Sequence, residues 1–343
     1  MEKYTDTVTV IIPCRNEEKF IGACLDSFVN QTYPKELLNI IVADGMSTDN
    51  TRNIINEYCN KYKFINMIDN EEFIVPKGMN KAMKLNNSDI NIIFGAHAEA
   101  DKNFVLENVK ALINDDVACV GGTIETINST NKGSAIALAM SCPFGVGNAL
   151  FRYATKESYV DTVGFGGYRK SILDKIGYFD EELVRNQDDE LNYRVIKEGY
   201  KILLTPKIKS KYYARGEYKK LWKQYFQYGY WKVRVIQKHN KPAALRHIIP
   251  LLFVIFLILG GIFSLFSKTI FYSYGFILAL YLLLAVYFSF KLSMKSKFRY
   301  LFNILPCFPI LHLSYGLGFL LGIINFYLLK SNSITNKNTD ISR

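Results

Sequence analysis

Two long stretches near the C-terminal end of the chain contain no charged side chain. Residues 248–267 hold no Asp, Glu, Lys or Arg, and neither do residues 269–290. About 20 residues of helix span the roughly 30 Å hydrocarbon core of a bilayer, where only helices and closed barrels satisfy their backbone polar groups. We therefore expect both stretches to be membrane-spanning helices.

A third uncharged stretch, residues 301–329, allows two arrangements. It is long enough for one tilted span, or for a short interfacial piece followed by a span. Pro306 and Pro309 favour the interrupted arrangement, because proline removes a helical hydrogen bond. We expect a membrane region at 248–330 with about three helical spans, and a polar tail at 331–343.

The positive charge of the chain is concentrated just before these stretches. The net charge is +11, and residues 201–247 carry thirteen Lys or Arg against one acid, Glu217, which leaves 29 basic and 30 acidic residues elsewhere. This distribution does not indicate nucleic-acid binding, and a solvated basic face is one explanation for it. We favour a basic segment at 236–247 that lies against anionic lipid headgroups.

The basic residues also predict orientation. Lys291, Lys295, Lys297 and Arg299 separate the second and third uncharged stretches. Because cytoplasmic loops carry an excess of Lys and Arg, this loop and the basic segment are expected in the cytoplasm. The chain begins with a polar segment and a short apolar run, unlike a signal peptide, so the region before the spans is also expected to be cytoplasmic.

The first 125 residues alternate short β-branched runs with stretches of helical spacing. We expect strands at 8–12, 39–43, 64–68, 91–94 and 117–121, and helices at 18–30 and 51–62. This alternation predicts an α/β fold with a doubly wound, mostly parallel sheet. Ligands of such sheets bind at the carboxyl ends of the strands.

Polar residues follow several of these strands. They occupy residues 13–17, 44–49 and 95–101, and an acidic triplet follows further along the chain. None of these segments is a GxGxxG or a GxxxxGK[ST] motif, which argues against dehydrogenases and P-loop enzymes. At the end of its strand, Asp44 suits either a bond to a nucleobase or ribose, or capping of the turn that follows.

Several motifs of the chain resemble those of family 2 glycosyltransferases. They are VTVIIPCRNEEKFIGACLDSF, IIVADGMSTDNT, VDTVGFGGYRKSIL, RNQDDELNYRVIKEGYKILLTP and QYFQYGYW, which together cover about residues 7–235. The resemblance is greatest to the membrane-anchored subgroup of succinoglycan-type exopolysaccharide assembly. It implies a GT-A nucleotide-sugar-binding domain over 1–235.

The resemblance also assigns part of the donor pocket. It implies that Asp44 contacts the base of the donor nucleotide. The loop with Pro13, Arg15, Asn16 and Glu17 would line the same pocket.

Sugar transfer needs a base for the acceptor hydroxyl, and three consecutive acids can supply one. Asp188, Asp189 and Glu190 stand near an expected helix start, where adjacent negative charges favour proton uptake near neutral pH. The family's ED-x-D/E-L pattern implies that Asp188 is the base and that Asp189 and Glu190 lie on the acceptor side. Gln187 replaces the family's Glu. A solvated helix start, favoured by the helix dipole, is the alternative.

The family's DXD metal motif is altered in this chain. The segment IIFGAHAEAD has Gly95 at the first motif position and His97 at the last. His97, Glu99 and Asp101 alternate with alanines, so they point the same way if the segment is extended. Histidine with carboxylates suits Mn²⁺ better than Mg²⁺, so we expect His97 to bind a divalent metal, Mn²⁺ or Mg²⁺. A histidine bonded to the backbone is the alternative.

Two further motifs bear on the donor and acceptor. Gly166 and Gly167 of GFGGYR would let the backbone approach the donor sugar, although an ordinary turn would need the same glycines. QYFQYGYW resembles the family's QxxRW motif and retains Gln227 and Trp231 on the acceptor side, with Tyr230 in place of Arg. That departure favours the addition of one sugar at a time.

These features predict an inverting, metal-assisted hexosyltransferase of the cell membrane. The donor would be a nucleotide diphosphate sugar, in the first instance a UDP-sugar, and Lys77 and Arg15 would share the charge of its diphosphate. The acceptor would be a polyprenyl-diphosphate-linked glycan of exopolysaccharide or capsule biosynthesis.

Two other functions remain open. One is a polyprenyl-phosphate sugar transferase, whose ionised acceptor needs no base. The other is a non-catalytic nucleotide-sugar-binding scaffold, which the missing Asp at Gly95 favours.

Overall fold

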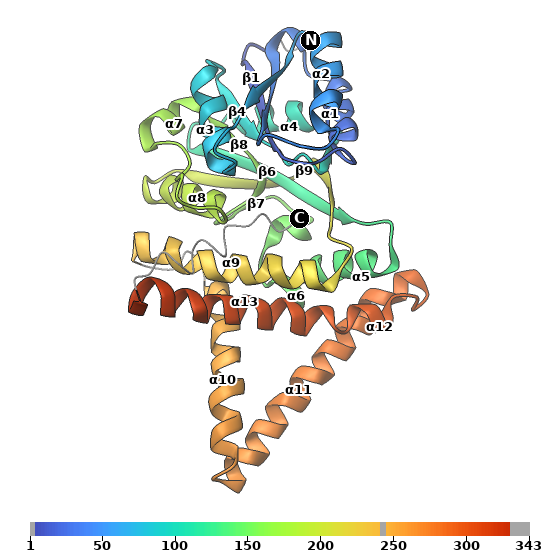
Figure 1. The fold of residues 1–343 in the computed structure, drawn as a ribbon, viewed down its shortest axis with the longest axis vertical. Coiled ribbons are helices and arrows are strands. Elements are labelled where there is room, and N and C mark those ends of the chain that lie inside the picture. Colours follow the sequence, from blue (N-terminus) through green and yellow to red (C-terminus); the bar gives the residue numbers. More distant parts are fainter. Residues whose placement is uncertain (1–3, 241–244, 330–343) are drawn as a thin grey trace. The chain divides into compact units, whose positions relative to one another are not determined.

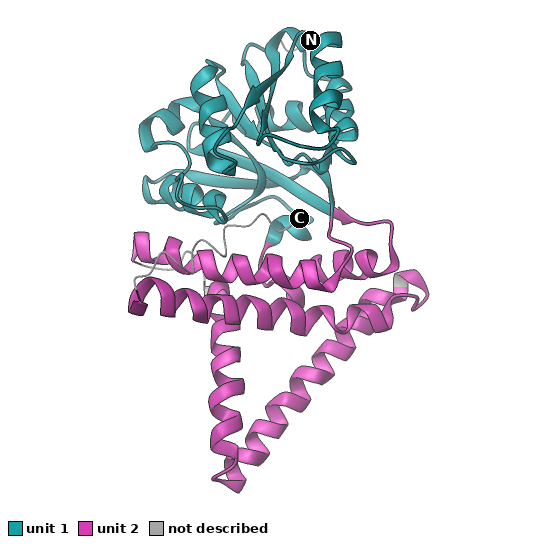
Figure 2. Ribbon diagram, viewed as in Figure 1, with its two compact units in different colours: residues 1–125, 150–213 teal, residues 126–149, 214–343 magenta. Residues whose placement is uncertain are grey.

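The computed structural model describes residues 4–240 and 245–329, shown as ribbons in Figure 1. The expected polar tail and part of the basic segment at 236–247 lie outside the described residues. Figure 2 shows two compact units: unit 1 contains residues 1–125 and 150–213, and unit 2 contains residues 126–149 and 214–343. This division differs from the expected domain at 1–235, because QYFQYGYW belongs to unit 2.

Unit 1 is an α/β unit. Its elements are β1 (Val8–Cys14), α1 (Ile21–Val29), η1 (Lys35–Leu37), β2 (Leu38–Asp44), α2 (Thr51–Lys61), β3 (Ile65–Asp69), α3 (Val75–Leu85), β4 (Ile90–Ile93), β5 (Ala98–Ala100), α4 (Phe104–Ala111), β6 (Val117–Ile127), η2 (Leu150–Arg152), β7 (Ser158–Tyr159), β8 (Gly164–Arg169), α7 (Lys170–Ile176), α8 (Gln187–Lys197) and β9 (Lys201–Tyr213). The strands and helices expected before residue 125 are all present. The last two residues of β6 belong to unit 2.

The strands form one mixed sheet in the order β3-β2-β1-β4-β8-β6-β9-β5, with β7 paired to β9. Strands β3, β2, β1 and β4 are parallel neighbours, because helices connect them in crossovers. From β8 onward the observed pairings are antiparallel. The parallel arrangement expected from the sequence therefore describes the first four strands, and the later strands reverse direction.

The sheet is buried on both faces. Val10 and Ile12 of β1 belong to one core cluster with Phe28 of α1. Ile11, between them, belongs to a second cluster with Met79 of α3. Because successive side chains of a strand point to opposite faces, only a continuous apolar run such as VTVII can fill both clusters.

Unit 2 is helical. Its elements are α5 (Asn131–Met140), α6 (Pro143–Val146), α9 (Tyr218–His239), η3 (Leu245–His247), α10 (Ile249–Ser264), α11 (Lys268–Ser293), η4 (Met294–Ser296), α12 (Leu301–Ile304), α13 (Cys307–Ile323) and the π-helical turn η5 (Ile324–Leu329). Within this unit, α9 lies beside α13, and α10 and α11 form a hairpin (Figure 1). The interruption expected in the third uncharged stretch is present between α12 and α13.

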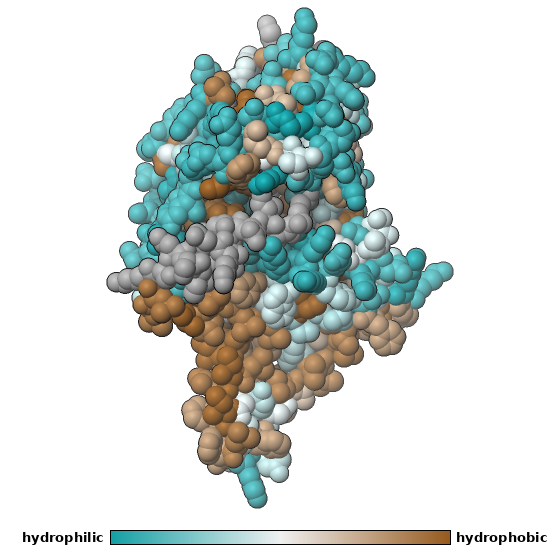
Figure 3. Space-filling view, in the orientation of Figure 1, coloured by the Kyte–Doolittle hydropathy of each residue, from teal (hydrophilic) through white to brown (hydrophobic). Residues whose placement is uncertain are grey.

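The hairpin of unit 2 exposes many apolar side chains. Figure 3 shows apolar residues gathered over α10 and α11. Among the described residues, Lys268–Ser293 and Leu301–Leu329 are long and apolar enough to cross a membrane, whereas α10 has 16 residues. Unit 2 therefore carries the features that the sequence assigned to a membrane region.

Candidate functional site

The loops that follow β1 and β2 are held together by hydrogen bonds. The backbone N–H of Asn16 donates to Ser47 Oγ at 2.8 Å, and that of Glu17 donates to Thr51 Oγ1 at 2.7 Å. Asn16 Oδ1 in turn accepts from the N–H of Thr48 at 2.8 Å. Asn16 has a φ of 53°, a left-handed conformation that asparagine tolerates better than most residues. These contacts fix the edge of the sheet where ligands of α/β folds bind.

Asp44 lies at the end of β2 with its side chain fully buried. Its carboxylate accepts from the Ser47 N–H at 3.0 Å and from Arg52 Nη1 at 2.6 Å. The same guanidinium lies 2.8 Å from Asp69 Oδ1 at the end of β3. A buried carboxylate needs such partners, because leaving it unpaired in the interior costs several kcal/mol. The turn-capping role is thus observed, and contact with a donor base stays a prediction.

The two cations expected near the diphosphate have other neighbours in the structure. The Arg15 guanidinium lies 4.6 Å from the centre of the Phe73 ring, which is a cation–π contact. Lys77 forms an ion pair with Glu72. Pro13 lies inside β1, opposite Ala43 of β2. A charge-neutralising role for Arg15 and Lys77 stays a prediction.

His97 joins the loop after β4 to the loop after β1. Its Nδ1 atom lies 3.4 Å from Glu17 Oε1, and the Glu17 side chain is only 6% exposed. The His97 ring meets the Tyr212 ring edge-on, with centroids 5.1 Å apart. The structure therefore brings together two side chains, His97 and Glu17, that the sequence placed in one pocket.

The acids that follow His97 do not converge with it. Glu99 accepts a hydrogen bond from the Tyr213 hydroxyl, which, with burial, raises the pKa of Tyr213 to about 12. Asp101 accepts from the Asn103 N–H at 3.0 Å near the start of α4. The extended segment β5 covers only residues 98–100, so the alternation is too short to align all three residues. Within residues 4–240 and 245–329, no group of three His, Cys, Asp or Glu is placed to hold a metal.

Gly95, where the family motif has an acid, faces an aromatic ring. A Cβ atom on Gly95 would lie 3.0 Å from Phe165 Cε1. The Phe165 ring also packs 4.4 Å from that of Phe94, and Phe165 has a left-handed φ of 54°. The ring thus takes the space into which a longer side chain at Gly95 would project.

Gly166 and Gly167 lie in strand β8 and not in a turn. Gly167 pairs with Ile92 of β4 and with β6, and a Cβ atom on it would lie 2.5 Å from Asn108 Oδ1. A Cβ atom on Gly166 would lie 2.9 Å from the Tyr168 ring. The turn that we considered as an alternative is wrong, and packing explains both glycines. Contact with a donor sugar stays a prediction.

Asp188 lies in the first turn of α8 and is exposed. Its Oδ1 accepts the Asp189 N–H at 2.9 Å. The buried Tyr168 hydroxyl donates to Asn192 Oδ1 of the same helix at 2.9 Å. Burial raises the pKa of Tyr168, and the charge of neighbouring Asp188 adds to this effect. Asp188 is thus a solvent-accessible carboxylate on a helix that the buried Tyr168–Asn192 hydrogen bond anchors.

Glu190 has a different environment from Asp188. It is 4% exposed and makes two bonds to Arg194, at 2.9 and 2.8 Å. Arg194 also donates to three consecutive backbone carbonyls, those of Ile176, Gly177 and Tyr178. The Glu190 carboxylate therefore fixes the segment after α7, and an acceptor-side role for it stays a prediction.

Comparison with known proteins identifies the family. Residues 9–177 match the family described as glycosyl transferase family 2. A relative from Methanococcus voltae, a dolichyl N-acetyl-alpha-D-glucosaminyl phosphate 3-beta-D-2,3-diacetamido-2,3-dideoxy-beta-D-glucuronosyltransferase, is 36% identical over 239 residues, 67% of this chain and 74% of the relative. The chain belongs to glycosyl transferase family 2. It is a glycosyltransferase, as the sequence predicted.

Further similarities agree with this assignment. The succinoglycan biosynthesis protein ExoA of Rhizobium meliloti is 28% identical over 244 residues, 71% of this chain and 74% of that protein. A mannosyltransferase from Pyrobaculum calidifontis, solved with GDP-Man and Mn²⁺, matches with a TM-score of 0.57 at 17% identity, over 91% of this chain and 87% of that one. This structural similarity confirms the GT-A fold.

The altered QxxRW motif of this glycosyltransferase lies on α9 in unit 2. Gln227 and Trp231 are each 1% exposed. Tyr230, at the position of the family's Arg, accepts a bond from Asn325 Nδ2 at 2.6 Å. The Trp231 ring packs against those of Tyr230 and Phe326. The motif is therefore packed inside unit 2, and an acceptor contact through Gln227 or Trp231 stays a prediction.

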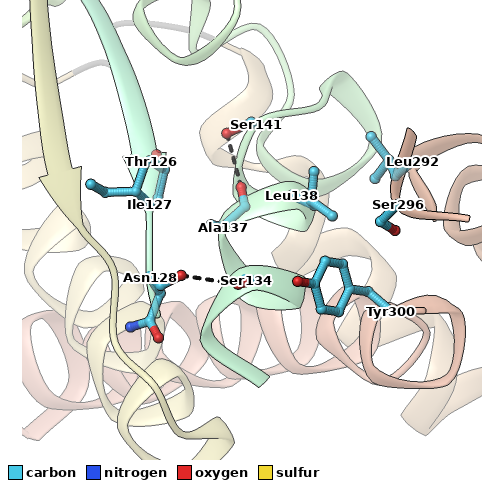
Figure 4. A pocket seen from close by; sticks show the side chains of 10 residues that line it. All are labelled: Thr126, Ile127, Asn128, Ser134, Ala137, Leu138, Ser141, Leu292, Ser296 and Tyr300. Carbon is cyan, nitrogen blue, oxygen red and sulfur yellow. Dashed lines mark hydrogen bonds between the residues drawn. The ribbon is translucent and has the colours of Figure 1, made fainter. Parts of the chain in front are cut away.

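A cavity of about 280 Å³ lies in unit 2 of the glycosyltransferase, between the end of β6, α5 and the end of α11 (Figure 4). Its polar lining includes Thr126, Asn128, Ser134, Ser296 and Tyr300. The Ser134 hydroxyl donates to the Asn128 carbonyl at 3.0 Å. None of the site residues expected from the sequence lines this cavity.

Two arginines of unit 1 near the predicted site residues were not expected from the sequence. Arg52 holds Asp44, and its place eight residues later, in the first turn of the following helix, was the available signal. The Arg152 guanidinium lies 5.3 Å from the centre of the Tyr212 ring, which contacts His97. No motif surrounds Arg152, so only the fold could reveal its position.

Proposed function

We propose that this chain is an inverting hexosyltransferase that adds one sugar to a lipid-linked glycan. The donor is a nucleotide diphosphate sugar, and a UDP-sugar is our first candidate. The acceptor is a polyprenyl-diphosphate-linked glycan of exopolysaccharide or capsule assembly. The observation that carries this proposal is the set of contacts between the segments that follow β1, β2 and β4. In these contacts, Glu17 donates its N–H to Thr51 and pairs its carboxylate with His97.

The names of the relatives support the acceptor class. The Methanococcus voltae protein is named for transfer to a dolichyl-linked N-acetylglucosaminyl phosphate, which is a lipid-linked sugar, with a 3-beta product. The second relative is named for succinoglycan biosynthesis. A β product from an α-linked donor requires inversion at the anomeric carbon. These names favour a lipid-linked sugar as acceptor over a bare polyprenyl phosphate.

The reaction requires one proton transfer and one displacement. The Asp188 carboxylate takes the proton of the acceptor hydroxyl as the hydroxyl oxygen attacks the anomeric carbon. The bond from that carbon to the diphosphate breaks, and the nucleoside diphosphate leaves with the bonding pair. Attack from the face opposite the leaving group inverts the configuration.

A divalent metal fits the residues near His97. The Pyrobaculum calidifontis enzyme was solved with Mn²⁺, as was GalNAc-T7, with UDP and GalNAc. His97 and Glu17 offer one nitrogen and one oxygen ligand 3.4 Å apart. Ions such as Mg²⁺ are commonly held by one or two protein groups together with substrate phosphates and water. His97 and Glu17 would hold the ion, whose charge would stabilise the departing diphosphate.

The proposed location is the cell membrane, with more than one span and with unit 1 in the cytoplasm. Lys291 in the last turn of α11, and Lys297 and Arg299 after it, belong on the cytoplasmic side by the positive-inside rule. This location would bring a lipid-linked acceptor to the enzyme.

Membranes that contain the full chain provide the test. They are incubated with a panel of radiolabelled UDP- and GDP-sugars and a native lipid extract, with or without EDTA. We expect label from one donor to enter a lipid-linked oligosaccharide, and EDTA to abolish transfer. A parallel incubation with polyprenyl monophosphate is the control. Label in that lipid alone would contradict the proposal and support the polyprenyl-phosphate transferase.

A further inference from the structure

Helix α9 is bonded at both ends to the segment that contains α12, α13 and η5. At the start of α9, the Tyr218 hydroxyl donates to the carbonyl of Asn303 in α12, just before α13, at 2.9 Å. At its end, Gln237 Nε2 donates to the carbonyl of Phe326 in η5, just after α13, at 3.0 Å. Because the partner numbers rise together, the two helices run parallel along the roughly 33 Å of α9.

Glycines bring the two backbones into direct contact. A Cβ atom on Gly229 of α9 would lie 2.0 Å from the Tyr315 carbonyl oxygen of α13. A Cβ atom on Gly318 of α13 would lie 2.0 Å from the Phe226 carbonyl oxygen of α9. Only glycine permits such approach, as in closely packed membrane helices. The two helices therefore form one rigid pair, and the position of α9 determines the position of α13.

The charges of α9 exclude it from the hydrocarbon core. The helix carries six cations: Lys219, Lys220, Lys223, Lys232, Arg234 and Lys238. Lys219, Lys220 and Lys223 are exposed, and Trp222 between them is 37% exposed. Basic residues with tryptophan are typical of the headgroup layer. A helix with six cations cannot cross the bilayer, so α13, fixed alongside it, does not cross either.

The opposite face of α13 is apolar. A half-buried stripe with helical spacing consists of Ile310, Leu313, Leu317 and Ile324. Such a stripe dips into the acyl chains when a helix lies in the interface. The hairpin begins beside this helix, because a Cβ atom on Gly316 would lie 2.3 Å from the Pro250 carbonyl oxygen of α10.

We propose that α9 and α13 lie together in the headgroup plane of the bilayer, and that only the α10–α11 hairpin crosses it. Helix α11 has 26 residues, or about 39 Å, which is ample for a span. Helix α10 has 16 residues, and the uncharged residues that flank it extend this arm to the 20 residues 248–267, which is enough to cross the core. Lys268 at the turn of the hairpin reaches the far headgroups with its long side chain. Leu329 and unit 1 then lie on the same side. This inference rests on the proposed membrane location but not on the proposed reaction.

Sidedness of single cysteines tests the number of spans. Three exposed positions are changed in the full chain, with half-buried Cys59 replaced by serine: Leu85→Cys in unit 1, Phe266→Cys at the hairpin turn, and Leu329→Cys. Oriented membrane vesicles are treated with a membrane-impermeant maleimide. We expect Leu85→Cys and Leu329→Cys to react in one vesicle orientation, and Phe266→Cys in the other. Reaction of Leu329→Cys together with Phe266→Cys would overturn the proposal.

Depth measurements test the interfacial position directly. Leu317→Cys on α13 and Leu280→Cys on α11 carry a fluorescent label in vesicles of equal parts phosphatidylglycerol and phosphatidylethanolamine. Lipids brominated near the headgroup should quench the label at Leu317 at least twofold more than lipids brominated deep in the chain, and the order should reverse at Leu280. Deep quenching at both positions would contradict the proposal. Neither readout needs transferase activity, so an inactive chain with the expected labelling would contradict only the proposed reaction.

Discussion

Among the described residues, the two longest apolar helical segments, α11 and the segment that contains α13, have similar hydropathy but differ in their surroundings. Their mean hydropathies are 2.0 and 1.8, yet 11% of the most apolar part of α11 is buried, against 44% of that of Leu301–Leu329. Helix α11 meets little protein, whereas α13 has a basic helix fixed along one side. Hydropathy therefore identifies segments that can lie in lipid. Whether such a segment spans the bilayer or lies in the headgroup layer depends on the helix packed against it.

The same contrast separates the two units. Exposed leucines are isolated in unit 1, where Leu85 is 64% exposed at the end of α3. In the hairpin they are contiguous, and Leu282 and Leu283 are 59% and 66% exposed. Isolated apolar residues are ordinary on a soluble surface, whereas a continuous apolar surface indicates lipid or a partner. We expect changes in unit 1 to alter catalysis or folding, and changes in the hairpin to alter membrane association.

The largest expected effect belongs to unit 1. Asp188→Asn removes the proposed base and should lower the rate of transfer by about 10²- to 10⁴-fold. Membrane association should not change, because the change lies outside unit 2. The assay follows label into lipid, together with the fraction of chain that sediments with membranes. Asp115→Asn, at a fully exposed side chain, is the control that should retain activity. Full activity of Asp188→Asn would contradict its assignment as the base.

A charge placed on an exposed leucine should sharpen the contrast between the units. Leu283→Arg, within α11, should cost about 2.5–3.5 kcal/mol of membrane insertion, because the guanidinium must enter or deform the hydrocarbon core. Leu85→Arg, at a site of similar exposure in unit 1, should have no such effect. Both are measured as the fraction of chain that resists extraction by alkaline carbonate. Equal extraction of the two variants would show that α11 does not lie in lipid.

Matched glycines test the comparison of α11 with α13. Gly318→Ala should destabilise unit 2 by about 1–3 kcal/mol, since its Cβ atom would overlap the Phe226 carbonyl oxygen. Gly275→Ala on α11 has no atom within 4 Å of its Cβ and should leave stability unchanged or raise it by up to about 1 kcal/mol. Thermal unfolding in detergent measures both. Equal losses in the two variants would contradict the close packing of α13.

The smallest expected effect is a pH dependence in unit 1. Hydrogen bonds from the Thr7 hydroxyl and N–H lower the pKa of Asp89 below its usual 3.8. The stabilisation is complete above about pH 3.8 and is lost as the pH falls through the lowered pKa. Thr7→Val should therefore reduce the stability of the full chain slightly at pH 6, and the difference from the parent chain should shrink below pH 3.8.

A neutral hydroxyl provides the control for this prediction. The Thr32 hydroxyl donates to the Lys102 carbonyl and the Asn103 amide oxygen, neither of which titrates. Thr32→Val should lose the same stability at both pH values in chemical unfolding experiments. A loss from Thr7→Val that is equally independent of pH would argue against the assigned role of Asp89.

Local patterns predicted much of the fold. The run VTVII predicted β1 and its burial on both faces, and the polar segments after β1, β2 and β4 were correctly expected to meet at one edge. Both results follow from periodicity and from the geometry of parallel strands, which depend on nearby residues. The motifs also predicted the family, which the comparisons confirm.

Features that depend on distant residues could not be predicted. The aromatic ring that faces Gly95 belongs to Phe165, and the helix that packs against α9 begins at Cys307. The antiparallel pairing of β8 likewise joins segments separated by a long connection. Arg52 was within reach of a local argument, because a buried acid at a strand end needs a cation and Arg52 follows Asp44 by only eight residues.

The contact between Gly95 and Phe165 constrains how this enzyme can change. An aspartate at this position would supply the acid of the family motif. The new side chain would nevertheless meet an aromatic ring held by a left-handed backbone seventy residues later. A smaller residue at Phe165 would make room for an acid at position 95, so the packing of this ring couples the two positions.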